Sequence, residues 1–317
     1  MNATVNVIRA ELFKALRKRR TYILAALQWV LLPVLVLIAG RVVQVNVSGS
    51  FVDEGELVDT IIQVIASPFG IARLSLMGPS YVSPTFYMIV IALFAALLIG
   101  EEKSQNMWKT ALVAQPNRLA VLGGKFVVAM TLYAAFLLGA YLSSILFGAI
   151  GMVFLPTNFT GEWGALLGLY ALQWLHGAAA FMFAFLMIFL ARNIALGIVM
   201  VFFLPALLEG LYTVYRTAIG FQPLNRLNVI FQALRLRTTL EELPRYFFTY
   251  NQYAPARSPT FELVTALGGD AAGSDFGPFS NFLGAGITLS HATLVMAGYA
   301  VFFGALLTWL FLRRDVQ

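Results

Sequence analysis

The sequence contains no cysteine and few charged residues. Of its 317 residues, 11% are charged and none is cysteine, which excludes disulfides, thiolate metal sites and iron–sulfur clusters. Soluble domains carry about 25% charged residues. Here 60% of the residues are apolar and the mean hydropathy is +0.80. Too little polar surface is available to cover such a chain in water, so an ordinary soluble enzyme and a disordered chain are both excluded.

Motifs for catalysis are also missing. A phosphate-binding loop requires GxxxxGK[ST], and the nearest match ends in Gly123-Gly124-Lys125, with Phe126 after the lysine and Leu119 at the first glycine position. The two histidines, His176 and His291, are expected at different membrane depths, which does not suit a pair of haem ligands. No HExxH zinc motif occurs. We therefore expect no catalytic, cofactor-binding or metal-binding residue in this chain.

The apolar residues gather in stretches long enough to cross a bilayer, which takes about 20 residues as a helix. We predict an all-α polytopic membrane protein that forms a single transmembrane domain over residues 1–317. Its six transmembrane helices are expected at 21–40, 83–100, 124–154, 165–191, 194–213 and 289–312.

The positive charge predicts the orientation of these spans. With both ends of the chain inside, the cytoplasmic segments hold 13 of the 21 Lys and Arg residues and four of the 15 acids. Basic residues near span ends mark the cytoplasmic face. The topology is therefore predicted as N-in and C-in, with extracytoplasmic segments at 41–82 and 214–288. The net charge of +6 is then a topology signal and predicts no nucleic-acid partner.

Residues 4–20 precede the first span and have the pattern of an amphipathic helix. Apolar residues recur at helical spacing, namely Val5, Ile8, Leu12 and Leu16. The opposite side holds Glu11, Lys14, Arg17 and Lys18, whereas Arg9 falls on the apolar side. We expect a helix on the inner leaflet with its cations near anionic lipid headgroups. The alternative is a basic anchor that only fixes topology.

The cytoplasmic loop over 101–123 is the most informative stretch. Glu101 and Glu102 open it, a helix-compatible run covers 105–114, and Pro116 interrupts that run because proline lacks an amide hydrogen. A short apolar helix on the inner face suits docking into a groove of a soluble partner, and Trp108 is the expected anchor. The alternative is an ordinary solvated connector.

This loop resembles that of the ABC-2 type permeases, the membrane subunits of ABC exporters. The residues that carry the resemblance are Glu101–Glu102, Asn106-Met107-Trp108-Lys109-Thr110, Ala111-Leu112-Val113, Pro116-Asn117-Arg118 and Gly124-Lys125. The Asn-x-Trp-Lys form is most similar to the lantibiotic-immunity and bacitracin-type branch, in which the ATPase is a separate chain. The longer segment 214–288 departs from the family pattern.

The resemblance implies a role for each part of the chain. Residues 4–20 would be the interfacial elbow helix, and 101–123 would hold the coupling helix that contacts the ATPase. The implied ATPase-coupling residues are Glu101, Glu102, Asn106, Trp108, Lys109, Thr110, Pro116, Arg118 and, in the short connection between the fourth and fifth spans, Arg192. The implied partners are an ABC ATPase dimer that binds ATP and Mg²⁺, a second permease copy or paralogue, membrane lipids and an extracytoplasmic accessory subunit. A multi-pass protein of the prokaryotic plasma membrane is implied.

A polar side chain inside a membrane span costs free energy, so each such residue calls for an explanation of its role. Glu209 lies toward the outer end of the fifth span, where it lines a translocation path or reaches the interface. Gln28, Gln173 and His176 are expected to hydrogen-bond between helices in preference to contacting substrate. The outer segments act as a gate or lid, or they only cap the bundle.

The function predicted from the sequence is therefore the permease subunit of an ATP-driven exporter. Two alternatives belong to other classes. The first is a membrane subunit that anchors or senses without transport. The second, which is less favoured, is an intramembrane enzyme.

Overall fold

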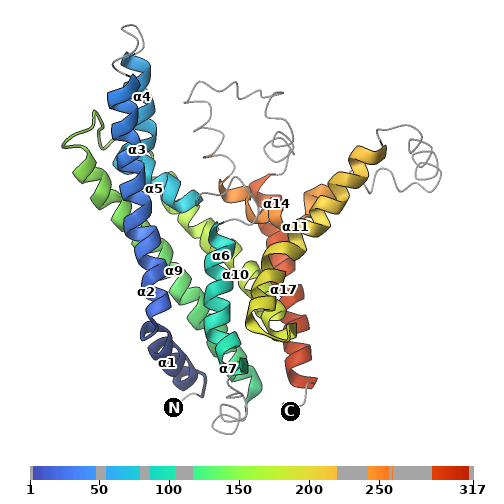
Figure 1. Ribbon diagram of the computed structural model, residues 1–317. Helices are drawn as coiled ribbons and strands as arrows, with labels where there is room; N and C mark the ends of the chain where they lie inside the picture. The colour runs from blue at the N-terminus through green and yellow to red at the C-terminus, as the bar shows by residue number, and fades with distance from the viewer. Residues whose placement is uncertain are drawn as a thin grey trace.

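The computed structural model describes residues 3–47, 55–78, 86–104, 117–219, 242–256, 259 and 288–313, and every regular element in them is helical. The long helices run between the two ends of the molecule, several of them tilted steeply against one another, and both chain ends lie at the same end (Figure 1). We call this the basal end and the opposite one the apical end. The all-α prediction is confirmed, and the shared end agrees with termini on one side of a membrane.

The first span is one helix that follows the N-terminal helix. Helix α1 (Ala3–Leu16) is joined by a short turn to α2 (Arg19–Ala26), the π-helical turn η1 (Leu27–Leu31) and α3 (Leu32–Val47). Pro33 removes an amide just after η1, where the helix widens. Arg19–Val45 is long and apolar enough to cross a membrane.

Two described helices of the segment predicted to lie outside, 41–82, pack against the bundle. Helices α4 (Gly55–Ala66) and α5 (Pro68–Met77) form a pair bent by 57°. The bend falls at Ser67, whose side chain caps α5 by accepting from the Gly70 amide at 3.0 Å. Eight of the ten residues of α5 are buried, and α5 packs along the long helix α9 (Arg118–Gly151). Helix α5 is therefore part of the packed interior of the bundle.

The second predicted span is short. It consists of α6 (Phe86–Ala95), the π-helical turn η2 (Ala96–Gly100) and α7 (Glu101–Ser104), which follow one another directly. The apolar part within the described residues, Phe86–Gly100, is below the length of a full span. Among those residues five helices can cross a membrane, or six if the bent pair is counted as one. Residues 83–85 lie outside the described part of the chain, so the span over 83–100 stays a prediction.

The other four predicted spans are present. They are α9 (Arg118–Gly151), α10 (Trp163–Leu190), α11 (Ile194–Ile219) and α17 (Leu289–Arg313). Helix α9 begins six residues before the predicted 124, so part of the predicted loop 101–123 is helix. The tight hairpin predicted between the fourth and fifth spans is also observed, because a Cβ on Gly197 of α11 would lie 2.8 Å from Cα of Ile188. Two short helices, η3 (Leu243–Tyr246) and α14 (Phe248–Gln252), pack beside α10, α11 and α17.

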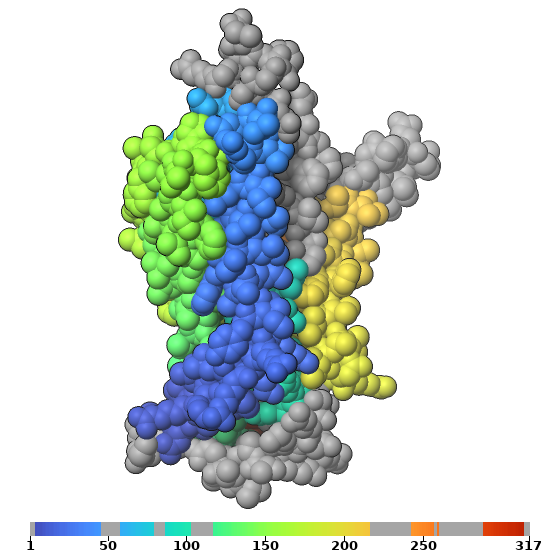
Figure 2. Space-filling model, turned by 60° about the vertical axis from the view of Figure 1, so that its left-hand side comes forward, coloured from blue at the N-terminus to red at the C-terminus, as the bar shows by residue number. Residues whose placement is uncertain are grey.

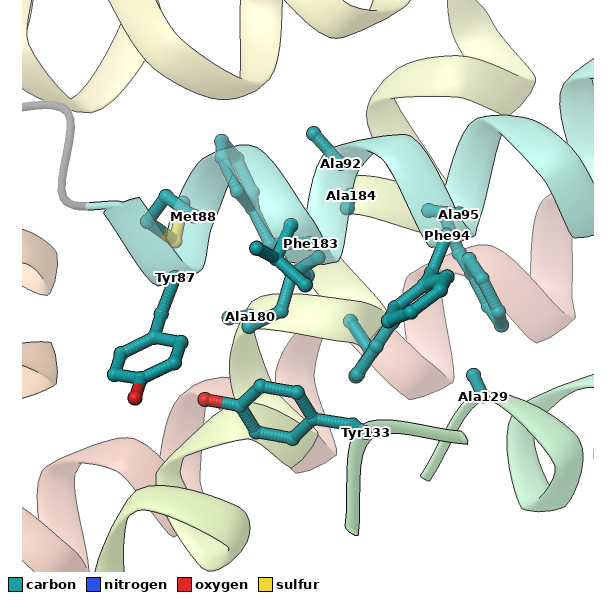
Figure 3. Close-up of a cluster of buried hydrophobic side chains, with 14 of the residues drawn as sticks. Tyr87, Met88, Ala92, Phe94, Ala95, Ala129, Tyr133, Ala180, Phe183 and Ala184 are labelled. Atoms are coloured by element: carbon teal, nitrogen blue, oxygen red, sulfur yellow. The ribbon is translucent and has the colours of Figure 1, made fainter. Parts of the chain in front are cut away.

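Aromatic side chains fill the core between α6, α9 and α10. Tyr133 of α9 meets Tyr87 and Phe181 edge to face, with ring centroids 5.9 and 5.7 Å apart. Figure 3 shows the Tyr87 and Tyr133 rings beside the α6 ribbon, with their hydroxyls turned toward each other. The faces of α3, α11 and α17 that point outward expose large apolar side chains such as Leu35, Phe203 and Val301, as expected where lipid is the solvent.

Candidate functional site: the basal end

Helix α1 packs directly on α9. A Cβ added to Gly124 of α9 would lie 2.7 Å from Cγ1 of Val7, so only glycine allows this approach. Ile8 and Leu12 pack against the core, and Ala15 is fully buried. The predicted apolar stripe is therefore divided: Ile8 and Leu12 face protein, whereas Val5 and Leu16 are exposed. Helix α9 therefore covers half of the apolar stripe. The predicted position of this helix on the inner leaflet stays a prediction.

Four charged side chains from three segments form a closed ring beneath this contact. Lys125 Nζ of α9 lies 2.7 Å from Glu11 Oε1 of α1 and 2.8 Å from Glu102 Oε2 of α7. Lys14 Nζ of α1 lies 2.8 Å from Glu11 Oε2 and also binds Glu102 Oε1. Each carboxylate thus contacts two lysines, and each lysine two carboxylates. We call Glu11, Lys14, Glu102 and Lys125 the basal ring.

Burial explains why the ring is closed. The Lys125 side chain is 0% exposed, and its ammonium also donates to the Leu98 carbonyl at 2.9 Å, in the π turn η2. A buried ammonium is very costly unless it is paired and hydrogen-bonded. Two lysines and two glutamates give the ring no net charge, so the buried charges compensate one another.

The ring shifts the pKa values of Glu102 and Lys14. Burial by itself would raise the pKa of the Glu102 carboxyl, but the charge and hydrogen bond of Lys125, with the hydrogen bond of Lys14, lower it below its ordinary value. Burial by itself would lower the pKa of Lys14, but hydrogen bonds to Glu102 and Glu11 raise it above its ordinary value. Both groups therefore stay charged across the neutral range.

Glu101 joins the same end of the molecule to the start of the first span. Its Oε2 lies 2.6 Å from Lys18 Nζ, and its Oε1 lies 3.3 Å from Arg20 Nη1. Both acids that the sequence assigns to ATPase coupling, Glu101 and Glu102, thus hold the elbow helix and its turn. Their predicted contact with a partner stays untested, and their contacts within the chain give them a positioning role.

Arg118 also makes its contacts within the chain. Asn117 caps α9 by accepting from the Ala120 amide at 3.1 Å. From the first turn of α9, Arg118 Nη1 donates to the carbonyls of Phe311 and Leu312 at 3.2 and 3.1 Å. These carbonyls end α17, where a cation is favoured because the last carbonyls lack helical partners. Arg118 thereby links the loop to the last span.

The second basal connection, between α10 and α11, lies beside the end of η2. A Cβ on Gly100, at the end of η2, would lie 3.0 Å from Cγ1 of Ile194, at the start of α11. Asn193 caps α11 by accepting from the Leu196 amide at 2.7 Å. Arg192 is exposed in the turn between α10 and α11. The end of η2 and the start of α11 are therefore neighbours, and Arg192 is at the surface.

Several predicted residues lie outside the described part of the chain. They are Asn106, Trp108, Lys109, Thr110 and Pro116, all in the basal loop. The structure does, however, place the two ends of the basal loop, at Ser104 and Asn117, on helices that meet at the basal ring.

The polar residues predicted inside spans hold helices together. Gln28 Nε2 donates to the Ser75 carbonyl at 3.0 Å, which links η1 to α5. His176 of α10 contacts the Asn251 carbonyl through Nδ1 at 3.1 Å and Thr293 Oγ1 through Nε2 at 3.2 Å. Gln173 is buried on the same helix. The preferred hypothesis of helix–helix hydrogen bonds is thus observed for Gln28 and His176.

Glu209 has a specific partner at the apical side. Its Oε1 accepts from the Thr249 amide at 2.8 Å, in the first turn of α14. Tyr299 of α17 donates to the Tyr246 carbonyl at 2.6 Å, next to the same short helix. Glu209 therefore fixes α14 between the spans, an arrangement that the sequence did not indicate.

Sequence reasoning also missed the pairing of Lys125, although a signal was present. A lysine followed by an apolar helix is expected to be buried, and it then requires a carboxylate at the same depth. The predicted basal segments contain four acids, and three of them, Glu11, Glu101 and Glu102, bind basic residues of this end.

A family model described as ABC-2 family transporter protein matches residues 7–207. The match covers most of α1, the basal ring and both basal connections, and it extends over more than half of the chain. The chain belongs to the ABC-2 transporter family. No curated protein matches the sequence. As a member of this family, the chain is a multi-pass membrane protein and a permease subunit of an ABC transporter, a component that is generally not catalytic itself.

Proposed function

We propose that this ABC-2 permease is the membrane subunit of an ATP-driven exporter of the prokaryotic plasma membrane. A separate ATPase dimer would bind ATP and Mg²⁺, and a second permease copy or paralogue would complete the translocation path. The observation that carries the proposal is the basal ring. It joins the elbow helix to the helices at both ends of the loop predicted to contact the ATPase.

Movement of the ATPase would reach the bundle through this loop. Residues 105–116 lie between α7 and α9, and the basal ring fixes both helices to α1 through Glu102 and Lys125. Arg118 extends the connection to α17, and the Gly100–Ile194 contact extends it to α11. Packed helices shift as rigid bodies between discrete arrangements. A push on the loop would therefore tilt the spans together.

The two groups of predicted coupling residues have separate roles in this scheme. Asn106, Trp108, Lys109, Thr110 and Pro116 would form the docking segment, with Trp108 as the anchor, and Arg192 would make the second contact. Glu101, Glu102 and Arg118 would position that segment through their bonds to the elbow helix and to α17. ATP binding to the partner would favour one of two arrangements, and the docked loop would transmit that preference.

The path for cargo would lie between the spans, closed apically by α14. Gln28, Gln173, His176 and Glu209 would stabilise its walls and its closure. The form of the loop also resembles the lantibiotic-immunity and bacitracin-type branch, so an amphipathic cargo is the class we favour. An accessory subunit on the apical side would fit the long segment 214–288.

Purification of the native complex tests the proposal. The tagged chain, extracted from its own membrane, is expected to co-purify with a P-loop ATPase in equal amount and with ATP hydrolysis that vanadate inhibits. A chain that purifies without an ATPase would contradict it and would favour an anchor or sensor. A bound haem or a lipid-modifying activity would favour an intramembrane enzyme.

A further inference from the structure

Glu209 is a carboxylate inside a span, and no basic side chain compensates it. It is the sixteenth residue of α11, so it lies about 22 Å along that helix from the basal end, within a hydrocarbon layer of about 30 Å. Among the described residues, no Lys, Arg or His forms an ion pair with it. A charge at this depth is costly, and it usually marks the path of an ion or a substrate.

Aromatic side chains flank the contact between Glu209 and α14. Glu209 Oε1 accepts from the Thr249 amide at 2.8 Å. The ring of Phe247, two residues before Thr249, meets the ring of Tyr212 edge to face at a centroid distance of 5.2 Å. Tyr212 follows Glu209 by three residues, so the two residues share a face of α11. Glu209, Tyr212 and Phe247 are all half-buried, so a ligand can still reach them.

A second group of rings continues from α14 toward α17. The Phe248 ring lies 5.3 Å from the ring of Tyr299 and 5.2 Å from the ring of Phe183. Tyr299 in turn stacks on Phe303, with ring centroids 5.5 Å apart. In Figure 1, α14 lies beside α11 and α17, which brings these rings to the same level as Glu209. Cations are attracted to the faces of such rings, most strongly where water is excluded.

Two buried side-chain oxygens of α14 lack a donor. Asn251 Nδ2 donates to the carbonyls of Arg245 and Phe247 at 2.8 and 2.7 Å, whereas its Oδ1 has no partner among the described residues. The same holds for Oε1 of the neighbouring Gln252. The guanidinium of Arg245 lies 4.0 Å from Glu242 at the surface. This region therefore offers a carboxylate, amide oxygens and ring faces, a combination that favours a cation over an anion.

We propose that Glu209, Tyr212 and Phe247 form a binding site for the organic cation of an amphipathic cargo. We call these three residues the apical Glu209 site. The carboxylate would balance the charge of the cargo, and the rings would contact the apolar part beside that charge. The inference rests on the proposed export function, in which cargo passes α14 at the apical end. Because the Thr249 amide occupies Glu209 in the closed arrangement, a bound cation would replace it and so favour the opening of α14.

Protection of Glu209 from chemical modification tests the site directly. The full-length chain, without the ATPase, is kept in a nonionic sugar detergent and treated with dicyclohexylcarbodiimide, an apolar reagent for carboxyl groups in apolar surroundings. Mass spectrometry gives the rate at Glu209 and at Glu162, an exposed acid just before α10 that serves as the control. Decyltrimethylammonium at about ten times its Kd should slow the reaction of Glu209 about tenfold and leave that of Glu162 unchanged. Decanol, which has the same chain without the charge, should protect neither.

Variants of Tyr212 test the ring with the same measurement. Tyr212→Leu should raise the concentration of decyltrimethylammonium that half-protects Glu209 by about twofold to fivefold, the effect of one cation–π contact at an exposed site. Tyr212→Phe keeps the ring and should behave like the wild type. An equal loss in both variants would assign the effect to the hydroxyl and contradict a role for the ring.

Three further results would overturn the proposal. Equal protection by decanol would show that the site does not select a charge. Equal protection by a short-chain phosphatidylcholine would assign the site to a lipid headgroup, which carries a similar cation. A Glu209 carboxyl that the carbodiimide never modifies would be closed to an amphipathic ligand. Because the ATPase is left out, none of these results bears on the export function, which co-purification of the ATPase tests separately.

Discussion

Lys125 Nζ of α9 lies 2.7 Å from Glu11 Oε1 of α1, with 113 residues between them in the sequence. The lysine is completely buried, and its other carboxylate, Glu102, comes from the end of the α6–α7 helix. One ammonium group thus connects three segments that meet at the basal end. These contacts fix α1 to the bundle.

Removal of Lys125 should destabilise the protein strongly. In Lys125→Met, Glu11 and Glu102 remain buried with Lys14 alone between them, and breaking a buried ion pair costs about 3–5 kcal/mol. Lys18→Met removes a half-exposed pair to Glu101 and should cost about 0–1 kcal/mol. Thermal unfolding of the detergent-solubilised proteins measures the difference, and equal losses for the two variants would refute the role given to the basal ring.

Two adjacent glycines should respond in opposite ways to alanine. Gly124→Ala places a methyl group 2.7 Å from Val7 Cγ1 and should separate α1 from α9, with a loss of stability of about 1–3 kcal/mol. Gly123→Ala meets nothing within 4 Å and should be neutral or stabilising, since alanine favours a helix by about 1 kcal/mol over glycine.

The double variant Val7→Ala with Gly124→Ala tests the contact itself. The valine methyl groups are then absent, so the two losses should be less than additive in an unfolding measurement. Additive losses would mean that Gly124 acts through something other than the packing of α1.

The basal ring should confer a defined pH dependence. The pKa of Glu102 is lower in the folded chain, so its stabilisation is complete at neutral pH and is lost as the pH falls through the folded-state pKa. The pKa of Lys14 is raised, so its contribution is lost only as the pH rises through its folded-state value. The difference in unfolding temperature between wild type and Glu102→Gln should therefore shrink toward acid pH. A difference that does not change with pH would contradict this.

The apical helix α14 should loosen without Glu209. The Glu209 side chain accepts from the Thr249 amide at 2.8 Å, and leaving a buried donor unsatisfied costs about 1–3 kcal/mol. Glu209→Ala should therefore speed amide hydrogen exchange over Phe248–Gln252 by at least about tenfold, whereas Glu209→Gln keeps an acceptor oxygen and should change it less. Unchanged exchange in Glu209→Ala would exclude the proposed closure by this side chain.

The sequence predicted the parts of this fold that depend on local composition. Long apolar runs predicted five of the described helices that can span a membrane, and Arg192-Asn193 predicted the tight hairpin before α11. It did not predict the burial of α5. The apolar residues on either side of Ser67-Pro68 are equally compatible with a helix buried in the bundle and with one that lies on its surface.

The candidate site depended on contacts between distant residues. Glu102 and Arg118 were identified as important, but their partners, Lys125 and the carbonyls ending α17, are set by how the helices pack. A helical pattern in α1 gives the spacing of its faces but not which face α9 covers. Gly124, beside Val7, decides that question through shape rather than hydrophobicity.

The central claim is that a separate ATPase acts on this permease through residues 105–116, and one binding measurement tests it most directly. The amount of ATPase that co-purifies with the tagged chain is compared for wild type, Trp108→Ala and Trp309→Ala, where Trp309 is a 49% exposed residue of α17 and serves as the control. Loss of a central aromatic anchor costs at least about 2 kcal/mol of binding, or roughly 30-fold in affinity. We predict that Trp108→Ala loses the ATPase and that Trp309→Ala retains it. Wild-type amounts of ATPase with Trp108→Ala would contradict the account.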